Sequence, residues 1–126
     1  MERIKFTIPL NPVTKKNHGR IIVAGKRRKL LPSAAYEAYE HDCGFFIPHR
    51  GEKLSEPVEI TCRFYMKTRR RVDLANLLNA IDDILVHYGV IEDDNSAIIV
   101  SHDGSRVLYD KENPRTEVDI HGAPTA

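Results

Sequence analysis

Apolar and polar residues alternate in two segments of the chain, a pattern that is typical of half-buried β-strands. Ile4, Phe6, Ile8 and Leu10 share one side of residues 3–10, and the same alternation returns over residues 58–66. Successive side chains of a strand point to opposite faces of a sheet, so each segment can bury one face. We predict strands there, the first ending at Pro9 or lying on a sheet edge because proline lacks an N–H.

Between residues 73 and 88 the apolar positions recur at three- and four-residue steps, which predicts a helix. The residues that form this apolar face are Leu74, Leu77, Leu78, Ile81, Ile84, Leu85 and Tyr88. Gly89 follows, at the position where helices commonly end with a left-handed residue. Gly89 is therefore a candidate for the left-handed residue at which this helix ends.

A second helix is predicted from Pro32-Ser33 to about Phe46, with Ser33 as its N-cap. We place Ala35, Tyr39 and Phe46 on its inner face. Shorter apolar runs and turn residues indicate the remaining elements. They are strands over residues 21–23, 98–100, 106–109 and 116–120, turns at 24–26 and 103–104, and a frayed tail over 121–126.

This order of elements predicts a single α/β (α+β) domain over residues 1–126, with a mixed β-sheet and two main helices. The length of 126 residues suits one domain that can bury its own core. Cys43 and Cys62 have no nearby partners at zinc-ligand spacing, so we expect two reduced, partly buried thiols. No apolar run approaches the roughly 18 residues of a membrane span, and no signal peptide is evident, so we expect a cytoplasmic protein.

The net charge of +1 hides an uneven distribution of charge along the chain. Residues 14–30 contain seven Lys or Arg and no acid, and residues 67–71 contain four more, again with no acid. Acidic residues gather instead between Asp73 and Asp94. Basic segments can meet phosphates, although solvated basic loops are also common in small proteins. The second basic run favours an anionic partner because it directly precedes the acidic helix.

Metal-dependent hydrolysis of a phosphodiester needs two or three carboxylates that hold Mg²⁺. The candidates are Asp73, Asp82, Asp83, Glu92, Asp93 and Asp94. On a helix, Asp73, Asn76, Ala80, Asp83 and His87 share one stripe beside the apolar face, whereas we expect Asp82 to point to solvent.

The spacing of these acids limits the site. Asp73 and Asp83 lie roughly 15 Å apart along a helix, too far to share one metal through bonds of about 2.1 Å. If the chain returns extended after Gly89, residues 90–94 span roughly 16 Å and bring Asp94 beside Asp83. Joining Asp73 to Asp94 requires this return at full stretch or a second subunit with an antiparallel helix.

Each acid also has a structural explanation. Asp73 can be an N-cap worth roughly 1 kcal/mol, residues 92–95 can be an acidic turn, and Asp83 can pair with a loop cation. On spacing alone we favour these structural roles.

A longer sequence pattern favours a functional role for these acids. Its parts, in order, are Arg69 to Leu77, Asp83 to Leu85, and Gly89 to Asp94. This pattern resembles the signature of RusA-like Holliday junction resolvases: a basic run, Asp-x-Asp-Asn-Leu, a helix with an inner Asp, a Gly followed by apolar residues, and a closing Asp-Asp. The opening strand and the turn before Lys15, Lys16 and Asn17 are also similar to the family.

The resemblance implies a homodimer that uses Mg²⁺ or Mn²⁺ to nick four-way DNA junctions symmetrically. It implies metal-binding aspartates at Asp73 and Asp94. The family's second aspartate falls at Ala75 and its basic helix residue at Asn79, which are two departures. Asn76, Asp83 or Asp93 can complete the metal site, or catalysis is impaired. The family is common in prophages, which we take as the expected source.

We expect basic residues to bind DNA phosphates, giving recognition by shape and charge. They are Arg69, Arg70, Arg71, Lys15, Lys16 and Arg20, followed by residues 26–29. Three hypotheses remain: an active structure-selective endonuclease, a branched-DNA-binding protein that has lost catalysis, and a protein-interaction domain with incidental basic loops.

Overall fold

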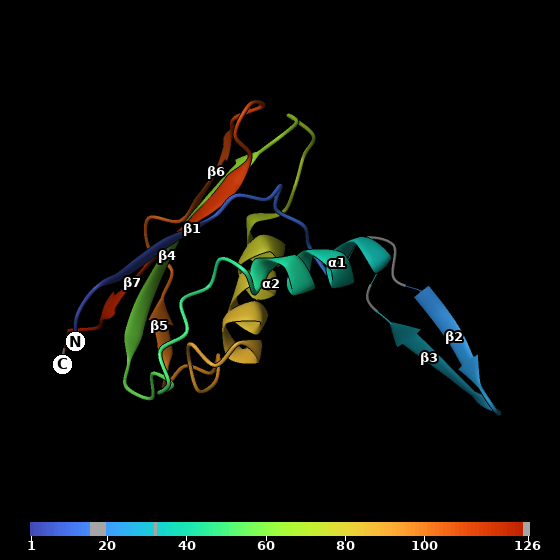
Figure 1. Ribbon diagram of the computed structural model, residues 1–126, viewed down its shortest axis with the longest axis horizontal. Coiled ribbons are helices and arrows are strands. Elements are labelled where there is room, and N and C mark those ends of the chain that lie inside the picture. Colours follow the sequence, from blue (N-terminus) through green and yellow to red (C-terminus); the bar gives the residue numbers. More distant parts are fainter. Residues whose placement is uncertain (16–19, 32, 125–126) are drawn as a thin grey trace.

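One five-stranded mixed sheet with two helices on the same side forms the body of the protein (Figure 1). The computed structural model describes residues 1–15, 20–31 and 33–124, without the side chains of residues 20, 22, 29 and 30. The elements are β1 (Ile4–Ile8), β2 (Arg20–Ala24), β3 (Arg27–Leu31), α1 (Ala34–Cys43), β4 (Val58–Met66), α2 (Leu74–His87), β5 (Ile99–Ser101), β6 (Arg106–Tyr109) and β7 (Arg115–Gly122). The predicted mixed sheet with two main helices is confirmed.

The central strand β4 covers the predicted residues 58–66 and pairs on both sides. β7 is antiparallel to β4 and also pairs antiparallel with β1, so the strand order begins β1-β7-β4. On its other side β4 is parallel to both β5 and β6, which meet successive parts of the same strand. β7 continues through Gly122, two residues into the segment that we expected to be frayed.

The inward residues of the sheet alternate with outward ones, as the sequence pattern predicts. Ile60, Cys62 and Phe64 of β4 are buried and lie opposite Ile120, Val118 and Thr116 of β7. Leu77, Ile81, Ile84 and Leu85 of α2 complete this core and are at most 1% exposed. Cys43 and Cys62 are buried free thiols, as expected.

The first helix differs from its prediction in length and in its buried face. Ser33 is the N-cap as predicted, and its Oγ accepts a hydrogen bond from the Tyr36 amide at 3.1 Å. The helix ends at Cys43, however, and buries Tyr36, Tyr39 and Cys43. Ala35 is exposed and Phe46 lies beyond the helix with 39% exposure. The buried residues are three and four positions apart, but the first of them is Tyr36 and not Ala35.

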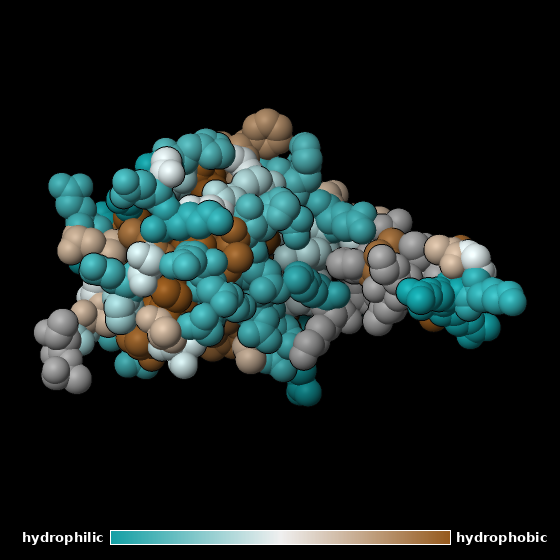
Figure 2. Space-filling model, turned by 90° about the horizontal axis from the view of Figure 1, so that it is seen from below, coloured by the Kyte–Doolittle hydropathy of each residue, from teal (hydrophilic) through white to brown (hydrophobic). Residues whose placement is uncertain are grey.

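A separate hairpin was only half predicted. β2 covers the expected strand at 21–23, and Gly25 turns the chain with a φ of 65°. The basic residues that follow form β3, paired antiparallel with β2. This hairpin extends away from the body beyond the N-terminal end of α1 (Figure 1). Its exposed tip carries Lys26, Arg27 and Arg28 and is hydrophilic in Figure 2.

Candidate functional site

Three residues of α2 face a pocket of about 330 Å³. They are Asn76, Asn79 and Asp83, which share one side of the helix because they are three and four residues apart. Lys15, from the segment after β1, and Asp94, from the segment after α2, complete the lining. The pocket thus gathers two carboxylates, two amides and one ammonium from three parts of the chain.

The turn after α2 brings Asp94 to this pocket. Gly89 has a φ of 74°, the left-handed conformation that favours glycine. The returning chain is then fixed to residue 54: the Leu54 amide donates to the Val90 carbonyl and the Glu92 amide to the Leu54 carbonyl, both at 2.9 Å. The chain therefore reverses at Gly89, which was the condition for Asp94 to lie beside Asp83, and both acids line one pocket.

Lys15 reaches the pocket from an anchored segment. Pro12 and Thr14 are buried, and the Asn11 side-chain oxygen accepts a hydrogen bond from the Lys67 amide at 3.0 Å. The Lys15 ammonium lies 2.6 Å from Asp83 Oδ2 and 5.6 Å from the centre of the Tyr36 ring. Both partners of this ion pair are more than one-third exposed, so solvent screens the pair.

The negative charge in the pocket exceeds what Lys15 balances. Partial burial, a hydrogen bond with the Asp93 side chain and the nearby charge of Asp83 raise the pKa of Asp94. A raised pKa means that Asp94 is ionised against unfavourable surroundings. A further cation in the pocket would relieve this repulsion.

The donor set fits a magnesium or manganese ion. These ions prefer oxygen ligands and commonly use one or two carboxylates, with water and substrate phosphate filling the other positions. Asp83 and Asp94 supply the carboxylates, and Asn76 and Asn79 supply amide oxygens. Within the described residues no group of three or more His, Cys, Asp or Glu could hold a metal. A site here would therefore rest on two carboxylates.

Two of the acids predicted to bind the metal, Asp73 and Asp93, lie outside the pocket lining. Asp73 is the N-cap of α2, and its Oδ1 accepts a hydrogen bond from the Ala75 amide at 2.9 Å. Asp93 accepts hydrogen bonds from the Asp94 amide at 2.8 Å and the Asn95 side chain at 2.9 Å, which lower its pKa. Both have the structural roles that the sequence allowed, and their part in metal binding stays a prediction.

The prediction for the exposure of Asp82 is wrong. We expected it to point to solvent, but it is 7% exposed. Its Oδ2 lies 2.8 Å from His102 Nε2, and the other ring nitrogen of His102 lies 2.9 Å from the Ile60 carbonyl oxygen. The position on the helix was right, but the segment between β5 and β6 covers it. Helical periodicity gives the direction of a side chain and not what packs there.

The predicted arginines occupy two environments. The Arg69 guanidinium lies over the Tyr109 ring at 4.0 Å from its centre. Arg70 and Arg71 line a second pocket of about 340 Å³ with residues 11–14, the segment that leads directly to Lys15. Within the described residues neither forms an ion pair. Lys16 lies outside the described residues, as does the side chain of Arg20.

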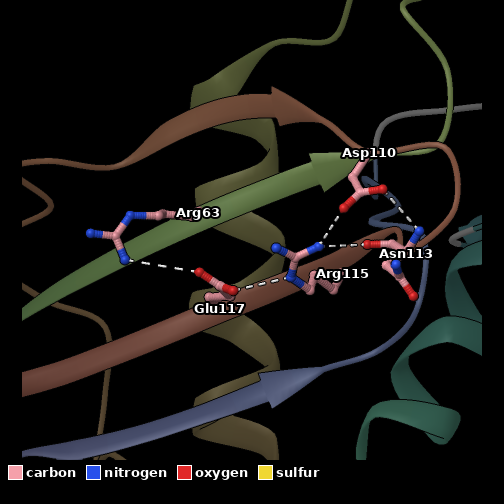
Figure 3. Close-up of polar contacts among 5 residues, drawn as sticks. All are labelled: Arg63, Asp110, Asn113, Arg115 and Glu117. Atoms are coloured by element: carbon pink, nitrogen blue, oxygen red, sulfur yellow. Dashed lines mark hydrogen bonds and ion pairs between the residues drawn. The ribbon is translucent and has the colours of Figure 1, made fainter.

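Other cations are held by protein partners on the open face of the sheet (Figure 3). Arg115 donates to Glu117 at 3.0 Å, to Asp110 at 2.9 Å and to the Asn113 carbonyl at 2.9 Å, and it stacks on Tyr65 at 3.7 Å. Arg63 lies 3.9 Å from Glu117. These pairs balance the charge of this face, so the arginines beside the pockets are the better candidates for phosphate binding.

Sequence reasoning missed Asn79 and His102. Asn79 was recognised only as a departure from a family pattern, although its spacing from Asn76 and Asp83 puts it on the same side of α2. His102 carried no local signal, because its partner Asp82 is 20 residues away.

Comparison with protein-family models matches residues 9–121 to the model described as Endodeoxyribonuclease RusA. The match includes both helices, strands β2 to β6, β7 up to His121 and every residue of the pocket, whereas β1 lies before it. Comparison with curated protein sequences finds no match. Neither helix of the described residues is long and apolar enough to cross a membrane.

Proposed function

Because the chain belongs to the RusA endodeoxyribonuclease family, we propose that it is a Mg²⁺- or Mn²⁺-dependent nuclease that cuts four-way DNA junctions. The observation that carries the proposal is the pocket in which Asp83 and Asp94 meet. They are brought together from a helix and from the chain that returns after it, with oxygen donors that suit a divalent cation.

Within this pocket the chain's own residues have distinct tasks. Asp83 and Asp94 would hold the metal, with Asn76 and Asn79 as further oxygen donors. The metal, when bound, supplies charge relief on the phosphodiester and a more nucleophilic water. Asp83 is fixed by a packed helix and Asp94 by the strand-like pairing of its segment with Leu54, so neither has to be ordered when the substrate arrives.

DNA binding is assigned to the cations beside the pocket. Arg70 and Arg71 and the segment before Lys15 line adjacent surfaces, so one DNA backbone can contact both. Contacts with phosphate alone hold DNA without reading its sequence. We expect Arg70→Gln to weaken binding to every junction and to reduce the salt slope by about one. Arg63→Gln is the matched control, because Arg63 is paired with Glu117 on the open face.

We also propose a homodimer. Asp73 matches a family metal position but caps the helix outside the pocket lining of its own chain. A partner with an antiparallel α2 would bring a second Asp73 near this pocket. Mixed dimers of Asp73→Asn and Asp94→Asn chains provide the test: a site built from two chains regains cleavage in the mixture, and a site within one chain does not.

The deciding experiment uses a labelled four-way junction with Mg²⁺, with Mn²⁺ and with EDTA. We expect paired nicks that require metal and disappear in Asp94→Asn. Glu92→Gln is the matched control, since Glu92 is an exposed acid two residues away that does not line the pocket.

One alternative has its own observation. Ala75 stands where the family's second aspartate is expected, and its methyl group cannot bind a metal. Salt-dependent junction binding without cleavage in either metal would make the protein a branched-DNA-binding member of the family. Loss of both binding and cleavage would leave a protein-interaction domain.

A further inference from the structure

The pocket already contains one cation of its own. The Lys15 ammonium sits 2.6 Å from Asp83 Oδ2, at the carboxylate that a divalent cation would also need. A carboxylate oxygen in direct contact with an ammonium group has lost part of its capacity to bind a metal. Lys15 and the metal therefore compete for Asp83.

The backbone that carries Lys15 is anchored, so its position beside Asp83 does not depend on the length of its side chain alone. Pro12 and Thr14, just before it, are buried, and Asn11 is bonded to the Lys67 amide. The ammonium also lies over the ring of Tyr36, whose side chain is fully buried, at 5.6 Å from the ring centre. An aromatic face attracts a cation and offers it a place beside the carboxylate.

The pair is nevertheless weak enough to exchange. The Lys15 and Asp83 side chains are 41% and 37% exposed, and half-exposed ion pairs contribute little to stability. A divalent ion carries twice the charge of lysine. It can take the Asp83 oxygen while Lys15 stays in the same pocket, tethered by its chain.

We propose that Lys15 is an exchangeable internal cation: it occupies Asp83 before the metal binds, and metal binding releases it toward the phosphate of the bound DNA. The inference rests on the proposed metal-dependent function. It assigns to Lys15 two effects of opposite sign, one that weakens metal binding and one that strengthens contact with the substrate.

Binding of Mn²⁺ alone to the full-length protein separates these effects. We expect Lys15→Gln to bind Mn²⁺ about two- to fivefold more tightly than the wild type, the ratio that corresponds to one half-exposed ion pair. Free Mn²⁺, followed by electron paramagnetic resonance at low ionic strength, gives the dissociation constant without DNA. The same variant should cleave junctions more slowly at saturating metal.

Two further variants separate the effect of the positive charge from the effect of its position in the pocket. Lys15→Arg keeps the positive charge, so its affinity for Mn²⁺ should stay near the wild-type value. Lys5→Gln removes the same charge from a lysine that lies 4.0 Å from Asp119 on the open face of the sheet, and it should leave both readouts unchanged. An equal gain in affinity in Lys5→Gln would reduce the effect to net charge and overturn the proposal.

The outcomes also separate this inference from the proposed function. If the wild type binds Mn²⁺ and Lys15→Gln binds it equally or less tightly, Lys15 does not compete and the inference is wrong, while the metal-dependent function stands. If only Lys15→Gln binds, the competition is supported in its strongest form. If neither binds, the inference and the metal-dependent function fail together.

Discussion

Two neighbouring carboxylates on α2 form ion pairs of different kinds, one buried and one in the proposed metal pocket. Asp82 is paired with His102 at 2.8 Å, and Asp83 with Lys15 at 2.6 Å. The distances are similar, but the exposed fractions of the side chains differ: 10% and 24% for the first pair, 37% and 41% for the second. Exposure, rather than contact distance, distinguishes the two pairs.

The buried pair joins α2 to the edge of the sheet. His102 bridges Asp82 and the Ile60 carbonyl, so one ring ties the helix to the segment between β5 and β6 and to β4. Removing one partner of a buried pair leaves an uncompensated charge, which costs several kcal/mol. The exposed pair can open because water replaces either partner at little cost. The helix is thus held by a buried pair on one side, whereas its pair on the other side is exposed to solvent.

The largest expected difference between the two carboxylates is in catalysis. Asp83→Asn should reduce junction cleavage roughly a hundredfold or more, because a metal ligand supports several kcal/mol of transition-state stabilisation and each 1.4 kcal/mol is tenfold in rate. Its stability should stay close to wild type. Asp82→Asn, measured in the same single-turnover assay at a temperature where it is folded, should retain most of the rate. Equal loss in both would remove the distinction.

The second difference is in stability. His102→Ala leaves Asp82 buried without its partner and should lower the free energy of unfolding by about 3 kcal/mol, measured by urea titration. His121→Ala is the matched control, because His121 pairs with Glu59 at 2.7 Å on the more exposed face. The free energy of unfolding of His121→Ala should fall by less than about 1 kcal/mol. Adding Asp82→Asn to His102→Ala should recover part of the loss, since it removes the stranded charge.

The third difference is in pH dependence. The hydrogen bond and charge of Asp82 raise the pKa of His102 above its usual 6.5. The folded protein therefore binds this proton more tightly than the unfolded chain, so the contribution to stability is complete below the unfolded pKa and is lost as pH rises through the folded one. The stability gap between wild type and His102→Ala should be wider at about pH 6 than at about pH 9. A constant gap would mean that His102 stabilises only by packing.

Local periodicity explains which parts of the fold could be predicted from the sequence. The alternation in β4 and the apolar steps of α2 predicted their elements almost to the residue, because local periodicity records which face is buried. Given a reversal at Gly89, the position of Asp94 beside Asp83 followed from helix length and strand rise. These inferences needed only distances along the chain.

Three of the misses depended on contacts with another segment of the chain. Asp82 faced outward on an isolated helix and became buried only because His102 covers it. The strand β3 was not predicted, because its basic composition does not indicate that it pairs with β2. Asp83 was expected to be able to pair with a loop cation, but the sequence did not identify that cation as Lys15, which is 68 positions away.

The smallest expected effect is the most informative about Lys15. Lys15→Gln should change the free energy of unfolding by no more than about 0.5 kcal/mol, and salt should erase even that, because the ion pair is exposed on both sides. A loss near the 3 kcal/mol expected for His102→Ala would make the Lys15–Asp83 pair structural. Lysine would then not leave Asp83 for a metal, and the contrast between the two sides of α2 would collapse. A negligible loss, together with tighter Mn²⁺ binding, leaves exchange as the role of Lys15, since a residue that holds the fold together cannot be removed at no cost.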